Sequence, residues 1–311
     1  MTSISDRPGR WERIGRILAG PGDVGWAISH AALPFAEVRE DGRVRVHFCA
    51  RDRTNCARIG YVDVDPERWT TAGPVSPTPV LDLGPRGAFD DHGVTSAWIV
   101  THEGRRYHYF TGWTLGQTVP FYFFVGLAIG NDDESGPRRV SPAPILDRSA
   151  IDPYLTASPC VLVEGGCWRM WYVSGVGWKV ESDPPQPIYH IKYAESADGI
   201  AWDRRGIVCI DFAAPDEHAI ARPWVVRDAD RYRMWFCCRG PAYRIGYAES
   251  PDGIVWNRRD DAAGLDASAS GWDSEMAAYP CIVDHRGVRY LIYNGNGYGR
   301  TGFGVARWVC G

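Results

Sequence analysis

A ten-residue stretch of this chain occurs twice. Residues 193–202 are YAESADGIAW and residues 247–256 are YAESPDGIVW, so eight of ten positions are identical at a spacing of 54 residues. Each copy follows an aromatic, strand-like run, WRMWYVSG at 168–175 and YRMWFCCRG at 232–240. The repeating unit is therefore longer than ten residues, and such a chain is expected to fold as a series of one supersecondary structure.

The same order of short apolar runs occurs five times. Each unit begins with a run anchored on a proline or its equivalent, and successive anchors are 57 to 64 residues apart: Pro34, Ala97, Pro159, Pro223 and Pro280. A turn rich in charge or glycine follows each run, then a second and a third strand-like run. A repeat near 60 residues with three or four strands in meander order is typical of the blades of a β-propeller.

The two ends of the chain predict how such a propeller closes. Candidate fourth strands, AWDRRGIVCI and VWNRRDD, occur in units three and four, whereas unit five ends after its third strand. The opening run RWERIGRIL at 10–18 resembles AWDRRGIVCI in its tryptophan, its charges and its β-branched tail. We therefore predict one all-β domain over 1–311, a five-bladed β-propeller closed by the N-terminal strand, which leaves no open sheet edge. The expected blades are roughly 25–80, 88–145, 150–210, 214–262, and 270–311 plus 10–18.

Composition agrees with this fold and argues against several classes of function. The 35 Gly, 22 Pro, 14 Trp and 15 Tyr suit short strands and tight turns. A net charge of −4 with dispersed basic residues gives no polycationic face for nucleic acid. No apolar run approaches the roughly 20 residues of a membrane helix, and no signal peptide is expected, so we predict a cytoplasmic protein without a membrane partner. The nine cysteines lack CxxC spacing and lie mostly in apolar runs, which predicts buried thiols.

Candidate site residues emerge when the five units are aligned on their anchors. The position seven residues before the anchor holds Ala27, Asp90, Asp152, Asp216 and Asp273. The next position holds Ile28, Asp91, Pro153, Glu217 and Ser274, and the one after it holds Ser29, His92, Tyr154, His218 and Glu275. An aspartate repeated in most blades is typical of a turn cap, so we expect Asp90, Asp216 and Asp273 to be structural.

The residues that differ between blades point to chemistry. Carboxylates from several blades around one channel suit glycosyl transfer, in which a protonated acid meets the leaving oxygen while a second carboxylate activates water or attacks. Expected substrate contacts are His30, His92, His218, Glu275, Arg222, Trp26, Trp113 and Tyr298. We predict no cofactor and no metal, although a metal site made by the three histidines is an alternative. Arg222 has two open interpretations, a ligand contact or a pair with a blade acid.

The sequence resembles the five-bladed propeller glycoside hydrolases, which include the arabinanases and β-xylosidases of family 43, the invertases and levansucrases, and the mannoside phosphorylases of family 130. The resemblance covers essentially the whole chain and rests on the blade pattern, the YAESxDGIxW turns, GAFDDHGVTSAWIV at 87–100 and GWDSEMAAYPCIV at 271–283. It implies a general acid at Glu217 and a pKa-modulating aspartate at Asp152. Where blade one of these enzymes supplies an aspartate, this chain has Ser29 and His30, with Asp23 the nearest carboxylate.

The resemblance leads to a functional hypothesis with alternatives. We predict a glycoside hydrolase-like enzyme for a small saccharide or glycoconjugate, with Glu217 as general acid, Asp91 as base or nucleophile and Asp152 as modulator. Because the blade-one aspartate is missing, other solutions stay open. Glu275 could be the base, or phosphate held by Arg222 and histidines could replace water, as in the phosphorylases. Alternatively, the propeller binds a sugar without cleaving it, in an accessory role in polysaccharide or natural-product metabolism.

Overall fold

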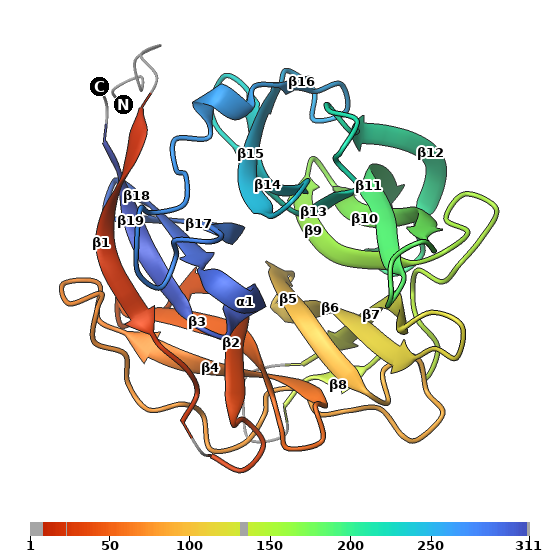
Figure 1. The fold of residues 1–311 in the computed structure, drawn as a ribbon, viewed down its shortest axis with the longest axis horizontal. Coiled ribbons are helices and arrows are strands. Elements are labelled where there is room, and N and C mark those ends of the chain that lie inside the picture. The colour runs from red at the N-terminus through yellow and green to blue at the C-terminus, as the bar shows by residue number, and fades with distance from the viewer. Residues whose placement is uncertain (1–8, 23, 131–135, 310–311) are drawn as a thin grey trace.

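Nearly all the regular secondary structure of the protein is β-strand. The computed structural model describes residues 9–22, 24–130 and 136–309. Within these ranges the chain forms strands β1 to β19, one 3-10 turn and one four-residue helix. Figure 1 shows the strands gathered in groups around a common centre, with the first strand, β1, beside the last, β19.

Consecutive strands form five groups. The first contains β2 (Ser29–Val38), β3 (Val44–Arg51) and β4 (Ala57–Val64), and the second contains β5 (Gly93–His102), β6 (Arg105–Leu115), β7 (Phe121–Ile129) and β8 (Arg138–Arg139). The third contains β9 (Thr156–Glu164), β10 (Cys167–Lys179), β11 (Gln186–Ser196) and β12 (Asp203–Ile210). The fourth contains β13 (Ala219–Arg227), β14 (Tyr232–Arg239), β15 (Tyr243–Ser250), β16 (Asn257–Arg258) and the turn η1 (Asp260–Ala262). The fifth contains β17 (Ala278–His285), β18 (Val288–Asn294), helix α1 (Asn296–Gly299) and β19 (Phe303–Val309).

Neighbouring strands within each group pair antiparallel in meander order. The N-terminal strand β1 (Arg10–Leu18) pairs antiparallel with β19, from Arg10 opposite Val309 to Leu18 opposite Phe303. The first and last strands of the chain therefore share one sheet, at the place where the sequence predicts an outer strand at 10–18. A single parallel pair of residues, Ala57 and Gly93, joins groups one and two.

The first strands of the five groups meet at the centre. Each contacts the next in the order β2, β5, β9, β13, β17 and back to β2. Every one of these strands has a register shift at its anchor. In four of them the residue before the anchor has positive φ, at Leu33, Ser158, Arg222 and Tyr279. A bulge of this kind bends the strand and re-aims a side chain, so the same backbone device shapes the centre repeatedly.

Aromatic side chains tie neighbouring groups together. Trp98 of β5 donates to the Val161 carbonyl of β9 at 2.8 Å, and Trp11 of β1 donates to the Ala263 carbonyl at 3.0 Å. The two copies of the ten-residue repeat form the turns β11–β12 and β15–β16. The carbonyls of Gly199 and Gly253 in these turns accept 2.7 Å bonds from Tyr109 and Trp171 of the preceding group. The repeat thus connects neighbouring groups, and its glycine carbonyls supply the acceptors that the buried Tyr and Trp donors require.

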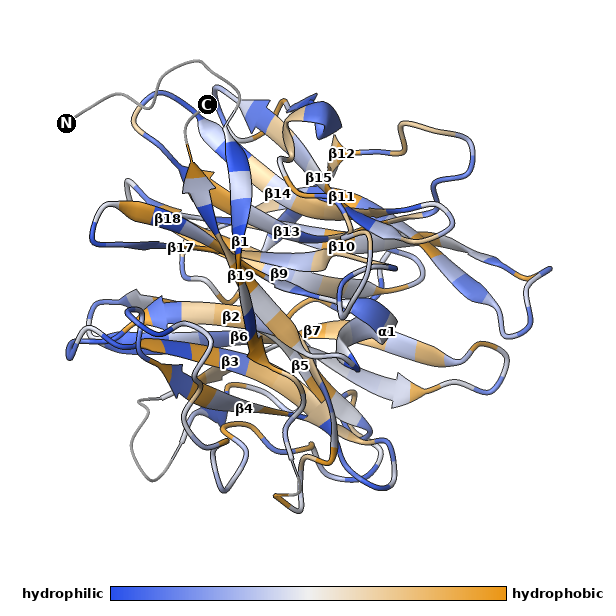
Figure 2. Ribbon diagram, turned by 60° about the vertical axis from the view of Figure 1, so that its left-hand side comes forward, coloured by the Kyte–Doolittle hydropathy of each residue, from blue (hydrophilic) through white to orange (hydrophobic). Residues whose placement is uncertain are grey.

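The interior is apolar and its thiols are reduced. Hydrophobic colour is concentrated along the strands in Figure 2, and hydrophilic colour in many of the connections. All eight cysteines in the described ranges are free, and five of them are buried, as predicted; Cys310 lies outside the described residues. Among the described helices, none has the length and apolar character needed to span a bilayer.

Candidate functional site

A cavity of about 500 Å³ opens at the centre, where the first strands meet. Small side chains two residues before the anchor line it in four groups: Ala32, Thr95, Ala157 and Ala221. Larger side chains come from the second strands, with Arg51 from β3, Trp113 from β6 and Arg239 from β14. These three occupy equivalent places, because each lies two residues after the residue that pairs with Ala32, Thr95 or Ala221. The small residues keep the centre open, and the second strands supply two guanidinium groups and an indole ring to it.

The polar side chains of this cavity are mostly basic groups and hydroxyls, with one amide from Gln186. His30, Arg51 and Arg239 supply the basic groups, and four tyrosines also line it: Tyr189, Tyr243, Tyr279 and Tyr298. No aspartate or glutamate is found among the described residues of its lining. A cavity of this size and character falls within the range of small-molecule sites, and its charge favours an acidic ligand.

The two cavity arginines lie beside aromatic rings. The Arg239 guanidinium lies 5.5 Å from the Tyr243 ring centroid and 5.7 Å from that of Tyr298. Arg51 donates to the Asn55 side-chain oxygen at 2.9 Å and lies 6.0 Å from the Trp113 ring. Neither arginine forms an ion pair with a carboxylate of the described residues. Guanidinium groups bind carboxylates and phosphates through paired N–H donors, so both are suited to a ligand anion.

His30 lines both the cavity, with Arg51 and Arg239, and a neighbouring basic cleft. Its backbone has a φ of 61°, and its Nδ1 lies 3.1 Å from the Ser29 hydroxyl oxygen. Burial, together with the charges of Arg51 and Arg300, lowers the pKa of His30 to about 4. His30 is therefore neutral at pH 7. It also borders an adjoining cleft of about 760 Å³ that contains Arg53 and Arg300.

The tyrosines form a hydrogen-bonding cluster on one side of the cavity. The hydroxyls of Tyr189 and Tyr243 hydrogen-bond to each other. Burial raises the pKa of Tyr189 to about 12, and it raises the pKa values of Tyr243 and Tyr279 as well. These phenols consequently stay protonated and can donate to ligand oxygens.

The acids that precede the first strands have a different role. In four groups one such acid pairs with an arginine of the outermost strand of the same group, and we call these pairs the clasps: Asp90–Arg139 (2.7 Å), Asp152–Arg204 (3.0 Å), Glu217–Arg258 (2.6 Å) and Asp273–Arg13 (2.9 Å). Each clasp arginine also donates to a backbone carbonyl at the start of the same turn, that of Asp82, Asp147, Asp211 or Asp266. The repetition indicates that the clasps hold inner and outer strands together.

The clasps account for two of the three predicted catalytic acids. Asp152 is fully buried, and it accepts from the Ser174 hydroxyl at 2.7 Å and from Lys192 at 3.4 Å. Glu217 binds Arg258 with both oxygens and accepts from the Ala213 amide at 2.7 Å. Although partial burial opposes it, this bonding lowers the pKa of Glu217, whereas a general acid needs a raised pKa. Neither side chain belongs to the described lining of the cavity.

The third predicted acid, Asp91, also lies outside the cavity lining. Its carboxylate accepts a 2.9 Å bond from the Gly87 amide in the turn before β5. That contact is of the turn-capping kind. Catalytic roles for Asp91, Asp152 and Glu217 stay predictions, and their positions do not favour them. By contrast, the expectation that Asp90 and Asp273 are structural agrees with their ion pairs.

No family model matches the chain. It is 43% identical over 298 residues to Rv1502, an uncharacterized protein of Mycobacterium tuberculosis strain H37Rv, and the match covers 95% of this chain and 98% of the relative. The chain belongs to the Rv1502 family. A second uncharacterized protein, MT1551 of strain CDC 1551, matches with the same identity and coverage.

Solved structures similar to this member of the Rv1502 family are glycoside hydrolases. One described as a glycoside hydrolase has a TM-score of 0.73 at 17% identity and covers 96% of this chain and 91% of its own. A glycosyl hydrolase from Bacteroides ovatus has a TM-score of 0.72 at 15% identity, covering 98% and 96%. An exo-1,5-α-L-arabinanase from a bovine ruminal metagenomic library has a TM-score of 0.60 at 16% identity, covering 90% and 92%. The Rv1502 family member therefore has the fold of the arabinanase and family-43 propeller enzymes.

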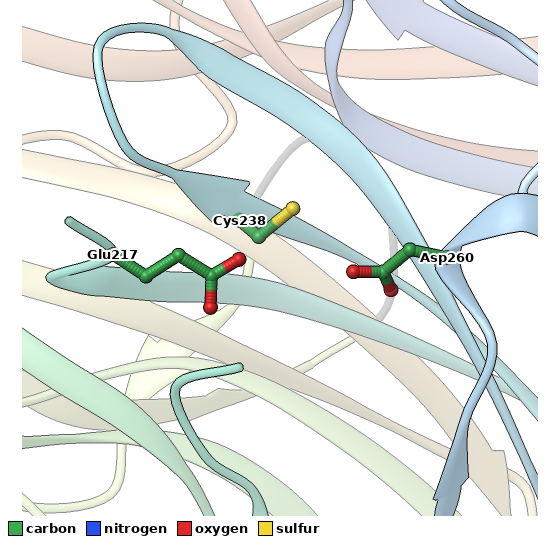
Figure 3. Close-up of side chains that lie close together, drawn as sticks. All are labelled: Glu217, Cys238 and Asp260. Atoms are coloured by element: carbon green, nitrogen blue, oxygen red, sulfur yellow. The ribbon is translucent and has the colours of Figure 1, made fainter. Parts of the chain in front are cut away.

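One further acidic cluster lies beside the Glu217 clasp. The carboxylates of Glu217 and Asp260 face each other near the Cys238 thiol (Figure 3), and the three ligand atoms lie within 4.8 Å of one another. The Arg258 guanidinium already binds both carboxylates at 2.6 Å. Burial raises the pKa of Cys238 to about 12, so its sulfur stays protonated. A metal ion here would have to displace both a guanidinium and a proton.

Of the predicted substrate contacts, His30, Trp113 and Tyr298 line the cavity. The other five do not belong to its described lining: Trp26, His92, His218, Arg222 and Glu275. Arg222 is fully buried and donates to the Pro34 carbonyl at 2.7 Å, and Trp26 donates to the Ser76 carbonyl at 3.1 Å. His30, His92 and His218 do not form a cluster of ring nitrogens within 4.8 Å in the described structure.

Sequence comparison of the units missed Arg51 and Arg239 because only the first strands were aligned for site residues. The signal lay in the second strands. The runs VRVHFCAR, YHYFTGW and YRMWFCCR end at Arg51, Trp113 and Arg239, which are the cavity residues. A second alignment on these strand ends would have brought the two arginines together.

Proposed function

We propose that the protein is a carbohydrate-binding propeller whose central cavity takes a sugar bearing a carboxylate or a phosphate. We interpret the five strand groups as five blades, with β1 completing the fifth. The observation that carries the proposal is the presence of Arg51 and Arg239 in a cavity whose described lining has no carboxylate. An unbalanced pair of guanidinium groups in a partly desolvated cavity favours binding of an anion.

The remaining lining suits a sugar ring. Trp113 and Tyr298 offer aromatic faces against which the C–H face of a pyranose can lie, and Tyr298 is 43% exposed. The hydroxyls of Tyr189 and Tyr243 can exchange hydrogen bonds with sugar hydroxyls. The likeness in fold to glycoside hydrolases supports a carbohydrate as the ligand class. Charge and shape together favour an acidic saccharide over a neutral one.

Hydrolysis by a pair of carboxylates is the second candidate, and the fold favours it. That chemistry needs two carboxyl groups flanking the scissile bond, roughly 5 to 9.5 Å apart. In this protein Glu217 and Asp152 bind arginines of the outer strands instead. Phosphorolysis fits the cavity arginines but still needs a protein acid at the leaving oxygen. We therefore place binding of an acidic sugar first, and cleavage second.

Calorimetric titration with glucuronic acid, glucose 6-phosphate and glucose tests the proposal. We expect at least one acidic sugar to bind at least tenfold more tightly than glucose, and Arg51→Met or Arg239→Met to weaken that binding by about 10 to 100-fold. Arg286→Met is the matched control, because Arg286 is an exposed arginine paired with Glu67 at the surface. Equal affinity for glucose, or hydrolysis of aryl glycosides that Glu217→Gln abolishes, would contradict the proposal.

A further inference from the structure

One side of the cavity is lined by apolar residues from two hairpin connections. The β6–β7 hairpin supplies Pro120, Phe121 and Phe123, and the β10–β11 hairpin supplies Pro184, Pro185 and Pro187, with the polar Gln186 between the last two. We call the six apolar residues the apolar wall. Arg51 and Arg239 come from β3 and β14, in other groups. The cavity thus combines basic groups and an apolar surface that belong to different parts of the molecule.

The apolar wall is poorly suited to the hydroxyl groups of a sugar. Its prolines have no backbone N–H and its phenylalanine side chains have no polar atom, so the side chains of these six residues offer no hydrogen-bond donor. A sugar hydroxyl pressed against it would lose hydrogen bonds to water without replacement. The rings of Phe121 and Phe123 are stacked at a centroid distance of 4.3 Å, and Phe121 also meets Trp178 at 5.6 Å. The wall is therefore a preformed surface for apolar groups.

The apolar surface continues outward on the same two hairpins. Leu115, the last residue of β6, is directly opposite Phe121 and is 59% exposed. Val180, directly after β10, is 69% exposed. Single exposed apolar residues are common on protein surfaces, and Val255 of the β15–β16 turn is equally exposed at 69%. The difference is that Leu115 and Val180 belong to the hairpins that form the apolar wall.

We propose that the acidic sugar is the head of an amphiphilic glycoconjugate, whose apolar aglycone lies against the apolar wall and extends over Leu115 and Val180. This inference rests on the proposed function, because the basic groups hold the sugar and thereby place its aglycone. Its independent support is the chemistry of the wall. An alkyl chain and an aromatic aglycone share this chemistry, and the experiment below distinguishes them.

The probes are glucuronic acid, hexyl β-glucuronide and phenyl β-glucuronide, titrated below the micelle concentration of the hexyl compound. We expect at least one glucuronide to bind tenfold or more tightly than glucuronic acid, since each buried methylene strengthens binding about fourfold. A larger gain for hexyl identifies an alkyl aglycone, and a larger gain for phenyl identifies an aromatic one. Leu115→Ser and Val180→Ser should each reduce the gain at least threefold, and Phe121→Ala should reduce it further.

Val255→Ser is the matched control, with the same exposure as Val180 and no place on either hairpin. It should leave all three affinities unchanged. If glucuronic acid binds but neither glucuronide binds more tightly, the aglycone inference is wrong while the proposed function stands. If Val255→Ser weakens the glucuronides as much as Val180→Ser does, the gain is non-specific adsorption and the inference is also wrong. If none of the probes binds, both proposals lose their support.

Discussion

Arginines of the clasps and arginines of the cavity illustrate two uses of one side chain. Arg139, Arg204, Arg258 and Arg13 each meet a carboxylate from the turn before a first strand. Arg51 and Arg239 end second strands and meet aromatic rings instead. An arginine paired with a carboxylate of the protein joins two strands. An arginine in a cavity whose described lining has no carboxylate can bind an anion from solution. The difference in charge balance separates structure from function here.

Repetition separates the two regions in the same way. The clasps occur in four groups with the same partners, an acid, an outer-strand arginine and a backbone carbonyl. The cavity positions differ from group to group, with Arg51, Trp113 and Arg239 at equivalent places. A feature that each group needs for its own packing is expected in every group. A single ligand at the centre meets each group differently, so the residues that contact it can differ between groups.

The largest effect that would sharpen this comparison is expected for Asp152→Asn. The substitution leaves the buried Lys192 and the partly buried Arg204 beside a neutral amide, so the free energy of unfolding should fall by about 3–5 kcal/mol. Urea denaturation measures it. Asp203→Asn is the control, because Asp203 is an exposed carboxylate on β12. A stable Asp152→Asn protein would show that this clasp contributes little.

A smaller loss is expected for Glu217→Gln, which tests directly whether this clasp acid is also catalytic. Removal of its charge weakens two bonds to Arg258, so stability should fall by about 1.5–3 kcal/mol while affinity for an acidic sugar stays within twofold. Thermal unfolding and calorimetry measure the two quantities. Glu103→Gln is the control, because the Glu103 side chain is 85% exposed. Unchanged stability with lost turnover on a glycoside would restore Glu217 to the role of general acid.

Arg13→Met is expected to cost about 1–2 kcal/mol, because the Arg13 side chain is 35% exposed. Loss of its bond to Asp273 should loosen β1 from the fifth group first. Hydrogen exchange of the β1 amides paired with β19 measures this local opening. Arg16→Met, an exposed arginine of the same strand, should change nothing. Uniformly faster exchange in all groups would instead indicate global destabilisation.

The smallest effect concerns pH and His30. Its pKa of about 4 in the folded protein lies below its ordinary value of 6.5, so the unfolded chain binds more protons between these values. His30 therefore contributes a loss of stability as pH falls from 6.5 to 4. A bound anion offsets the charges of Arg51 and Arg300 and raises the pKa of His30, so affinity for glucuronic acid should rise as pH falls from 7 to 5, by less than about threefold. Titrations with His30→Gln, which should be flat, provide the check.

The candidate site could be predicted only in part. His30, Trp113 and Tyr298, which the sequence offers as substrate contacts, line the cavity, and their role there stays a prediction. Glu217 forms the clasp of its group one residue later in the unit than Asp90, Asp152 and Asp273 do in theirs. The partner that reveals this role, Arg258, follows 41 residues later. No pattern in the sequence around Glu217 predicts which of the neighbouring acids pairs with Arg258.

The sequence by itself determined the period, the order of strands in each group and the pairing of 10–18 with the last strand. These features follow from apolar runs, from turn residues and from the tryptophan and charges that 10–18 shares with a fourth strand. Each of these signals lies within a short stretch of sequence. Only the tertiary structure decided which charges are balanced. The clasps join residues 41 to 260 positions apart, and the cavity combines strands of all five groups. Whether a charge is balanced depends on distances in space, which the order of residues does not state. For this reason the candidate site contains Arg51 and Arg239, and the predicted acids lie outside its described lining.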